Sequence, residues 1–258
     1  MSPVESFWHW KTPAGQFEYH GITFDLRKGV LTAIIGPNGC GKSTLMKCAA
    51  SLLKPSGGSI QIDGHPLDAL SEKERARFIS YMPQSRIVPD TSVRHLVTHG
   101  RYPYLQWGRN LRKEDREIVD AVLRRTGLTS YARRNVRVLS GGERQRAYLA
   151  MMLAQQTPVM LLDEPNTYLD LSNQFQLMQL LKELCREEHA VAVVMHDLAL
   201  ALEFADEILL LNDGECIASG TPEEVYRTGA IQDVFGIQIK RVMENKYIFY
   251  PREQEANP

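Results

Sequence analysis

A glycine-rich stretch near the start of the chain has the residue types and spacing of a site for nucleotide phosphates. The apolar run LTAII leads into GPNGCGKST, which fits the pattern G-x-x-x-x-G-K-[ST] between a strand and a helix. Glycines let backbone N–H groups wrap around phosphates, and a helix N-terminus favours negative charge. We expect Lys42 to reach the β- and γ-phosphates and the Ser43 hydroxyl to ligate Mg²⁺. The predicted phosphate-binding residues are Gly36, Pro37, Asn38, Gly39, Cys40, Gly41, Lys42, Ser43 and Thr44.

Two adjacent carboxylates follow the apolar run VMLL. Asp163 is placed to hold Mg²⁺, directly or through water, and Glu164 to orient or deprotonate an attacking water. An exposed acidic turn is the alternative, but the run immediately before these residues has to be buried. We therefore predict that the pair serves phosphate chemistry.

Two further polar residues come at the ends of apolar runs. His196 ends AVAVVM, where its imidazole could bond a γ-phosphate. A lone histidine in such a place is more often structural, but a phosphate loop and a carboxylate pair in the same chain favour a catalytic role. Gln84 follows a short apolar run in YMPQ, and its amide could reach Mg²⁺ or the attacking water. Spacing alone leaves a structural role for Gln84 open.

These residues need a common scaffold, and the apolar runs predict one. Residues 31–35, 159–162 and 190–195 are continuous apolar runs, which is typical of parallel strands covered on both faces. In open α/β sheets, ligands bind beyond the carboxyl ends of the strands. The sequence therefore predicts an α/β fold with a mostly parallel sheet. Three of its strands are each followed by residues suited to phosphate chemistry, and the sheet brings these residues to one place.

Helical patterns dominate the segment between the phosphate loop and the carboxylate pair. Residues 92–156 indicate a helical subdomain inserted into the α/β core, with Asp90 or Thr91 as an N-cap and Gly127 as a helix stop. Residues 209–220 are typical of a strand, an Asp-Gly turn and a returning strand. After Asp170, helical spacing predicts four residues packed into the core, namely Leu171, Phe175, Met178 and Leu181.

A second candidate anion site lies within this helical segment. The stretch LSGGERQR places Ser140, Gly141 and Gly142 at the start of a predicted helix, where free N–H groups can bind an anion. It contains no lysine. The chain thus carries two phosphate-binding stretches and only one lysine between them.

The composition is that of an ordinary globular protein, with 43% hydrophobic and 24% charged residues among 258. The apolar runs are too short to span a bilayer and the first ten residues do not resemble a signal peptide, so we expect a cytosolic chain. A net charge of −1 does not favour nucleic acid as a partner.

Residues 94–137 hold eleven Lys/Arg against four Asp/Glu, which indicates either a solvated helical face or a surface near anionic lipid. His95 and His99 are expected to be solvated or packed rather than metal ligands.

The ordered set of motifs resembles that of ABC transporter ATPase subunits. GPNGCGKST resembles the Walker A motif of that family, MPQ its Q-loop, LSGGERQR its signature and VMLLDEP its Walker B motif. YLD with Asp170 resembles the D-loop and MHD with His196 the H-loop. The resemblance implies a P-loop NTPase (RecA-like) core from residues 1–91 and 157–245, with an N-terminal antiparallel β portion. It also implies an inserted α-helical subdomain at 92–156 and a C-terminal tail at 246–258, all within one ABC ATPase domain.

The family resemblance also suggests why the second phosphate-binding stretch lacks a lysine. In this family two chains stack head to tail, and the signature of one closes over the γ-phosphate held by the other. Ser140, Gly141 and Gly142 are therefore expected to act in trans on ATP and Mg²⁺ bound by a second ATPase subunit, expected to be an identical chain. Asp170 is expected at the nucleotide, and Trp10, among Phe7, Trp8 and Trp10, is favoured for stacking on adenine. The sequence departs from the common pattern at Cys40, Glu143 and Asn166.

Within the family, the chain looks most like the ATPases of importers for ferric siderophores, haem or cobalamin. These commonly carry a GRxP stretch after the Q-loop, matched here by Gly100, Arg101, Tyr102 and Pro103. The expected partners are membrane permease subunits and, through them, an extracytoplasmic substrate-binding protein, which places the chain at the cytoplasmic face of the membrane. Alternatives are the ATPase of another ABC transporter, a soluble ABC protein acting on DNA or the ribosome, and a P-loop enzyme outside the family such as a kinase.

Overall fold

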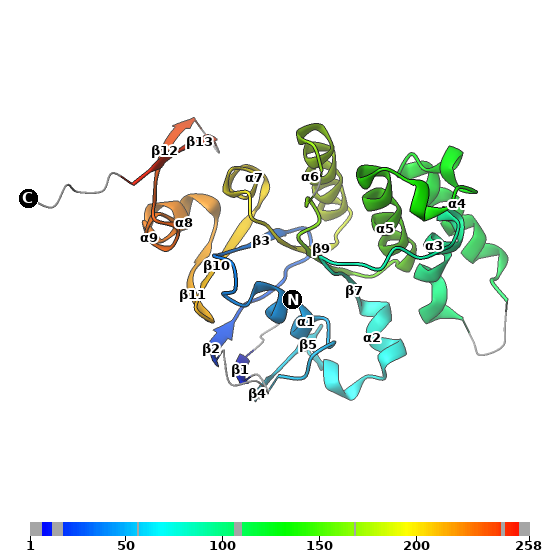
Figure 1. The fold of residues 1–258 in the computed structure, drawn as a ribbon. Coiled ribbons are helices and arrows are strands. Elements are labelled where there is room, and N and C mark those ends of the chain that lie inside the picture. Colours follow the sequence, from blue (N-terminus) through cyan, green and yellow to red (C-terminus); the bar gives the residue numbers. More distant parts are fainter. Residues whose placement is uncertain are drawn as a thin grey trace, which may run out of the picture.

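The structure is a computed structural model that describes residues 7–11, 18–55, 57–105, 110–167, 169–243 and 246–252. An α/β core occupies the middle of the molecule (Figure 1). A helical part built from residues 93–155 lies on one side of the core, and the C-terminal helices and hairpin lie on the other. The predicted α/β class with an inserted helical segment is confirmed.

The core is a six-stranded sheet in the order β11-β10-β3-β9-β8-β7. All neighbouring pairs are parallel except β10 with β11, which form the predicted hairpin around an Asp-Gly turn. The three strands predicted to lead into the chemically active residues, β3, β9 and β8, are adjacent in the middle of the sheet. The bounds are β3 (Leu31–Ile35), β7 (Ile79–Met82), β8 (Val159–Asp163), β9 (Ala190–Val194), β10 (Glu207–Asn212) and β11 (Glu215–Gly220).

The sheet is covered on both faces, which explains why its central strands are apolar throughout. Every residue of β3 is buried, and successive side chains point to opposite faces. Leu31 belongs to the same buried cluster as Leu181 of helix α6 (Leu171–Arg186), whereas Ile34 belongs to a second cluster with Met46 of helix α1 (Lys42–Ala49). Burying each such side chain contributes about 1.5–3 kcal/mol, so these two helices are held firmly against the strands that end at the site.

The predicted N-terminal antiparallel β portion is also present. Strands β1 (Phe7–Lys11), β2 (Glu18–Thr23) and β4 (Gly57–Ser59) pair antiparallel in the order β2-β1-β4. The short strands β5 (Gln61–Ile62) and β6 (His65–Pro66) follow, and helix α2 (Glu72–Phe78) then leads into β7. Ser71 and Glu74 form a capping box at the start of α2, which fixes where that helix begins.

The helical part contains helices α3 (Val93–Thr98), α4 (Lys113–Arg125) and α5 (Gly141–Gln155), joined by 3₁₀ segments at His99–Tyr104, Thr129–Tyr131 and Val136–Val138. The N-cap of α3 is Ser92, whose hydroxyl accepts from the His95 amide, so the predicted cap at Asp90 or Thr91 was wrong by one residue or two. Serine at this position is a strong cap, and Asp90 instead pairs with Arg137. Gly127 follows the end of α4 with φ of 67°, as predicted for a helix stop.

The C-terminal region contains helices α7 (Leu198–Phe204), α8 (Pro222–Arg227) and α9 (Ala230–Phe235) and the hairpin strands β12 (Ile237–Met243) and β13 (Lys246–Pro251). The prediction of a tail from residue 246 is therefore wrong, since residues 246–251 form a strand. Phe249 pairs with Ile239 in the hairpin, and Tyr247 packs on Tyr226 with ring centroids 5.1 Å apart. These contacts bury one face of the hairpin and order the segment.

Helix α6 corrects a second prediction. Met178 and Leu181 are buried as expected, but Leu171 is 70% exposed and Phe175 is 39% exposed. The helical period was right, whereas the first turn of α6 extends past the edge of the core. The exposed apolar residues therefore follow directly on Asp170, the N-cap of this helix.

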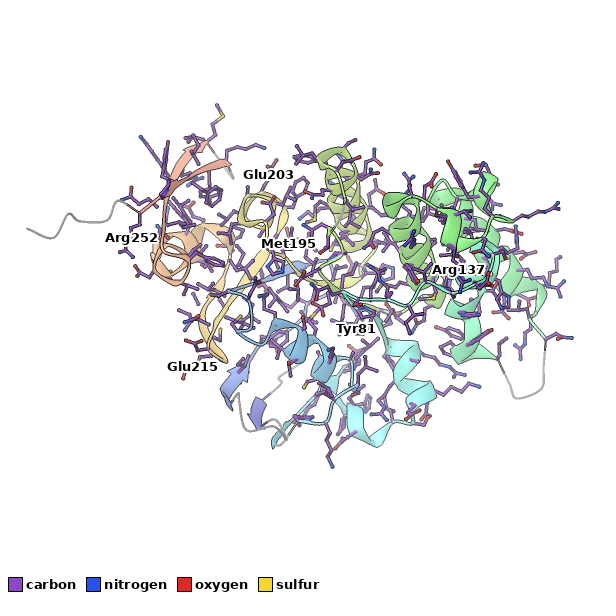
Figure 2. All side chains as sticks on the ribbon, viewed as in Figure 1. Tyr81, Arg137, Met195, Glu203, Glu215 and Arg252 are labelled. Carbon is purple, nitrogen blue, oxygen red and sulfur yellow. The ribbon has the colours of Figure 1, made fainter. Side chains whose placement is uncertain are left out.

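Several charged and histidine residues of the helical part have partners within it. Arg94 pairs with Asp120, and Arg101 with Asp115. The rings of His95 and His99 contact edge to face at 4.9 Å, and among the described residues no cluster of three potential metal ligands occurs. None of the described helices combines the length and apolar character needed to cross a bilayer. Figure 2 shows Arg137 in this helical part, well away from Met195 in the core.

The stretch predicted to mark the importer subgroup forms a buried joint between helices. A Cβ on Gly100 would lie 2.2 Å from the Met151 carbonyl oxygen of α5, so only glycine permits this approach. Arg101 is buried and donates through Nε to Asp115 Oδ1 at 2.9 Å. Its Nη1 donates to the Ala154 carbonyl oxygen at 2.8 Å and to Gln156. Arg101 therefore connects α4 to the C-terminal end of α5.

We predict that Arg101→Met destabilises the protein strongly. The substitution leaves Asp115 buried without its cation, and removing one partner of a buried ion pair costs about 3–5 kcal/mol. The free energy of unfolding, measured by urea denaturation, should fall by that amount. Arg116→Met is the matched control, since Arg116 is exposed on α4 and should change stability by no more than about 0.5 kcal/mol. Equal stability of the two variants would contradict the assignment.

Candidate active site

Four adjacent strands bring the predicted catalytic residues to one edge of the sheet. The phosphate loop follows β3, His196 follows β9, Asp163 ends β8 with Glu164 directly after it, and Gln84 follows β7. Because β3, β9, β8 and β7 are neighbours and parallel, all four carboxyl ends meet at the same edge. Figure 2 shows Tyr81 of β7 and Met195, which follows β9, in this central region.

The phosphate loop has a backbone that requires glycine. A Cβ on Gly36 would lie 2.2 Å from the Leu211 carbonyl oxygen, and Gly41, immediately before α1, has φ of 104°. Lys42 is buried, and its Nζ donates to the carbonyl oxygens of Gly36 and Pro37, both at 2.8 Å. The ammonium group is thus held inside the loop by neutral acceptors that a phosphate oxygen can replace.

Asp163 is nearly inaccessible, with 1% of its surface exposed. Ser43 Oγ donates to its Oδ1 at 3.0 Å, and the Tyr81 hydroxyl donates to its Oδ2 at 3.1 Å. Burial raises the pKa of Asp163, and these two hydrogen bonds oppose the rise by stabilising the carboxylate. Hydroxyl and carboxylate oxygens side by side are the donor set that suits Mg²⁺, so Ser43 and Asp163 fit that ion.

Glu164 contacts both of the other predicted catalytic residues. Gln84 Nε2 donates to its Oε2 at 2.6 Å, and His196 Nε2 lies 2.5 Å from its Oε1. The carboxylate is 7% exposed, whereas Gln84 and His196 are exposed. Glu164 also has φ of 49°, a left-handed conformation that costs a non-glycine residue about 1–3 kcal/mol. Such strain is typical of a functional position. In Glu164 this conformation holds the carboxylate in a fixed direction.

The signature segment lies apart from this cluster. Ser140 is the N-cap of α5, which stands among the helices of the helical part in Figure 1, while α1 lies beneath the central sheet. Ser140 and Gly141 are exposed, and within the described part of the chain no hydrogen bond joins residues 140–142 to the residues at the sheet edge. The start of the second predicted phosphate-binding stretch is therefore exposed to solvent.

Glu143 gives a structural reason for one departure from the family pattern. Its carboxylate accepts from the Ser140 amide at 2.8 Å, while Ser140 Oγ accepts from the Glu143 amide at 3.3 Å. The hydrogen bond from the Ser140 backbone lowers the pKa of Glu143 most, so the carboxylate stays charged at the positive end of α5. Nothing in the structure explains Asn166 in place of the usual threonine.

Three other predicted site residues have different outcomes. Asp170 caps α6 by accepting from the Asn173 amide at 2.8 Å and is exposed. Trp10 belongs to β1, but its side chain lies outside the described residues. The Cys40 thiol is buried in the core cluster with Met46, and burial raises its pKa. Only the backbone of Cys40 is therefore available for the phosphate loop.

Sequence reasoning missed Tyr81 as a site residue. Tyr81 pairs with Leu161 in the register of β7 and β8, so it shares a face with Asp163 two residues further along β8. A tyrosine inside an apolar strand gives no sign of this contact until the register is known.

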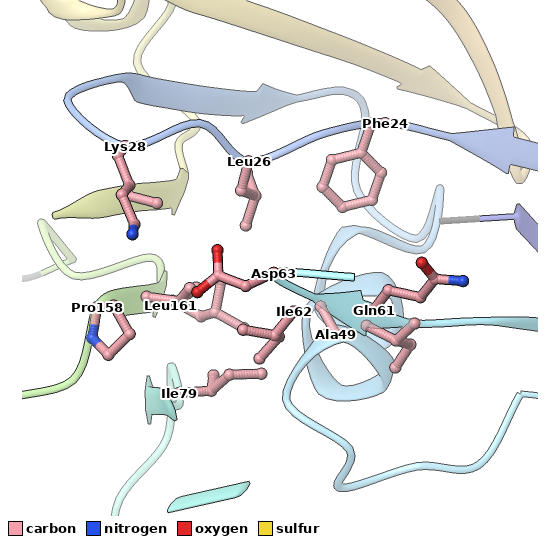
Figure 3. Close-up of a pocket in the computed structure, with 13 residues that line it drawn as sticks. Phe24, Leu26, Lys28, Ala49, Gln61, Ile62, Asp63, Ile79, Pro158 and Leu161 are labelled. Atoms are coloured by element: carbon pink, nitrogen blue, oxygen red, sulfur yellow. The ribbon is translucent and has the colours of Figure 1, made fainter. Parts of the chain in front are cut away.

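An apolar pocket lies at the opposite edge of the sheet. Figure 3 shows Leu26, Ile62, Ile79 and Leu161 around it, with Lys28 and Asp63 also among its lining residues. Ile79 and Pro158 mark the amino ends of β7 and β8. The pocket is therefore remote from the site at the carboxyl ends.

The fold and the site together define an ATP-binding cassette. The chain belongs to the ABC transporter family, whose model matches residues 19–167. It is 43% identical over 219 residues to the petrobactin import ATP-binding protein FpuD of Bacillus anthracis, covering 84% of this chain and 80% of that protein. It is also 43% identical over 219 residues to the ferric enterobactin transport ATP-binding protein FepC of Escherichia coli K12, covering 84% and 81%.

A solved structure adds the assembly state of a related cassette. The dimeric, post-hydrolysis structure of the ATP-binding cassette MJ0796 with ADP and Pi matches with a TM-score of 0.73 and 28% identity, covering 85% of this chain and 98% of that one. The protein is accordingly an ATP-binding and ATP-hydrolysing subunit of this family, and cassettes of this kind form dimers.

Proposed function

We propose that this protein hydrolyses ATP in the presence of Mg²⁺ to drive uptake of a ferric siderophore through a membrane importer. The observation that carries the proposal is the contact of Glu164 with Gln84 and His196. This contact lies beside Asp163 and Ser43, at the edge of the sheet that holds the phosphate loop. The class of cargo rests on the two relatives named for petrobactin and ferric enterobactin. Haem, cobalamin and other small solutes are the remaining candidates.

Lys42, Ser43 and the loop amides would hold the nucleotide. Lys42 would exchange the carbonyl oxygens of Gly36 and Pro37 for phosphate oxygens, which bind an ammonium more strongly because they are charged. Ser43, Asp163 and Gln84 would hold Mg²⁺, which supplies positive charge against the phosphate oxygens.

Glu164 would orient or deprotonate the attacking water, since its carboxylate already lies among polar groups at the carboxyl ends of the parallel strands. Its two present partners, Gln84 and His196, are exposed and can turn toward a bound nucleotide. His196 would then bond the γ-phosphate and Gln84 would reach Mg²⁺ or the water. Their departure frees both oxygens of Glu164 to accept a proton from water.

A second subunit, in our proposal an identical chain, would complete the site. Ser140 and Gly141 are exposed and Gly142 is half-buried at the N-terminus of α5, where free N–H groups favour an anion. They would close over the γ-phosphate bound by the partner, with Asp170 nearby in the same interface. We further propose that residues 92–156 move as one subdomain against a core of residues 1–91 and 157–245.

The remaining partners follow from the importer role. Permease subunits would bind the protein at the cytoplasmic face of the membrane, through the segment after Gln84 and the helical subdomain. An extracytoplasmic substrate-binding protein would act on the same permease. No nucleic acid is expected to take part.

Glu164→Gln is predicted to bind ATP but to hydrolyse it about 10²–10⁴-fold more slowly, the range contributed by a positioned general base. The amide keeps the size of the side chain but cannot take a proton. Phosphate release measures turnover, and size-exclusion chromatography with Mg-ATP should show the variant accumulating as a dimer. Glu215→Gln, at the exposed edge of β11, is the control that should hydrolyse ATP normally. Rapid turnover by Glu164→Gln would remove that residue from the catalytic role.

Complementation tests whether the signature acts in trans. Ser140→Arg should bind ATP as an isolated chain but hydrolyse none, because the large cation blocks the partner's phosphate. Lys42→Ala should also be inactive. A mixture of the two variants should regain hydrolysis, since each mixed dimer contains one site with an intact Lys42 and an intact Ser140. A signature that acted in cis would leave every site in the mixture defective, and no activity would return.

The importer role is tested by capture from membranes. Tagged Glu164→Gln protein, purified with Mg-ATP from detergent extracts of its own cells, should retain a membrane protein with several spans in a fixed ratio. Loss of that partner when Ser140→Arg is added to the same chain would link retention to the closed dimer. Recovery of ribosomal or DNA-bound proteins in place of a permease would contradict the transport proposal and leave the ATPase mechanism intact.

A further inference from the structure

Arg86 crosses from the loop after Gln84 to the helix that begins at the signature. Its Nη2 donates to Gln145 Oε1 of α5 at 2.6 Å, and its guanidinium lies over the Tyr148 ring at 4.5 Å from the centroid. Gln145 and Tyr148 are three residues apart and share one face of α5. Both are buried, so the guanidinium packs against side chains that are fixed in position rather than mobile.

The same two residues of α5 also bind the residue next to Arg86 and the separate loop that follows Glu164. The Tyr148 hydroxyl donates to the Ile87 carbonyl oxygen at 3.1 Å, next to Arg86 in the chain. Gln145 Nε2 donates to the carbonyl oxygen of Pro165, the residue after Glu164. One face of α5 therefore holds the segment after Gln84 and the segment after Glu164 together.

Helix α5 connects this surface to the signature. The helix runs from Gly141 to Gln155 with Ser140 as its N-cap, so Gln145 lies little more than one turn from the signature residues. A helix is stiff over such a length. Any displacement of the Arg86 loop that moves Gln145 and Tyr148 also moves Ser140.

We propose that Arg86 is a positioning residue that couples the Gln84–Glu164 cluster of one chain to the signature segment which that chain offers to its partner. The inference rests on the proposed function, because it takes the signature to act in trans. Occupancy of one nucleotide site would then be transmitted to the other site through Arg86, Gln145 and α5. This makes Arg86 a determinant of how ATP closes the dimer.

The way in which Arg86 is bound favours a movable contact over a fixed structural one. Its Nη1 is buried and has no hydrogen-bond partner within the described part of the chain. By contrast, the buried Arg101 donates to three acceptors in the same helical part. An unsatisfied buried donor is costly, so the Arg86 site is not optimised for this one state.

The test compares Arg86→Met with Arg86→Lys, each placed in the Glu164→Gln background. Arg86→Met should leave the ATP affinity of the isolated chain unchanged but weaken ATP-driven dimerisation about tenfold, within the usual range of coupling between sites. Arg86→Lys keeps the charge and a donor for Gln145 and should recover part of the loss. Arg116→Met is the control and should dimerise normally. Sedimentation velocity across a protein concentration series measures each dimerisation constant.

A double-variant cycle separates positioning from a general loss of packing. Gln145→Met should weaken dimerisation at least as much as Arg86→Met, since it also loses the contact with the Pro165 carbonyl oxygen. The double variant should be no worse than Gln145→Met alone, because the Arg86 contact is already broken there. Additive losses, normal dimerisation by Arg86→Met, or loss of ATP binding would overturn the proposal. The Glu164→Gln parent is measured first. Its failure to form an ATP-dependent dimer would count against the proposed function itself, whereas a normal parent with an unaffected Arg86→Met would reject the Arg86 inference alone.

Discussion

Two carboxylates buried at the end of one strand impose the arrangement of everything around them. A buried charge is stable only if hydrogen-bond donors reach it. Asp163 receives hydroxyl groups from Ser43 and Tyr81, and Glu164 receives an amide from Gln84 and an imidazole from His196. These four donors come from a helix and three neighbouring loops or strands. The parallel sheet satisfies the requirement because it ends all of these segments at one edge.

The same requirement prepares the site for a nucleotide. Lys42 rests on two carbonyl oxygens, and the loop glycines leave no side chain in the way. Each polar group is thus held by a neutral or exchangeable partner. A bound phosphate can take over these contacts without leaving a buried charge unpaired, so binding need not disrupt the core beneath the loop.

Much of the site could be predicted from the sequence because its signals are local. The phosphate loop, the carboxylate pair and His196 each follow a continuous apolar run, and such runs identify buried strands without any knowledge of their neighbours. The contacts of Tyr81 with Asp163 and of Arg86 with Gln145 could not be predicted, since they join residues 59 or more positions apart and the first depends on strand register. The C-terminal strand β13 was missed because its packing comes from α7 and from Tyr226 of α8, and its apolar run YIFY shows no alternation of polar and apolar residues.

The positions of Lys42 and of the signature in the fold support our proposal that two chains complete one site. Lys42 is fixed at the centre of the sheet by α1, whereas Ser140 is fixed at the outer end of a helix that packs against other helices. To bring both to one phosphate within a chain, α5 would have to leave the helices that it packs against, including the close approach at Gly100. Two copies facing each other avoid that cost, because each offers an outward helix N-terminus to the other's loop. If the signature serves the partner's site, as we propose, the contacts of Arg86 with Gln145 and Tyr148 of α5 give a route by which its position can depend on the nucleotide bound in its own chain.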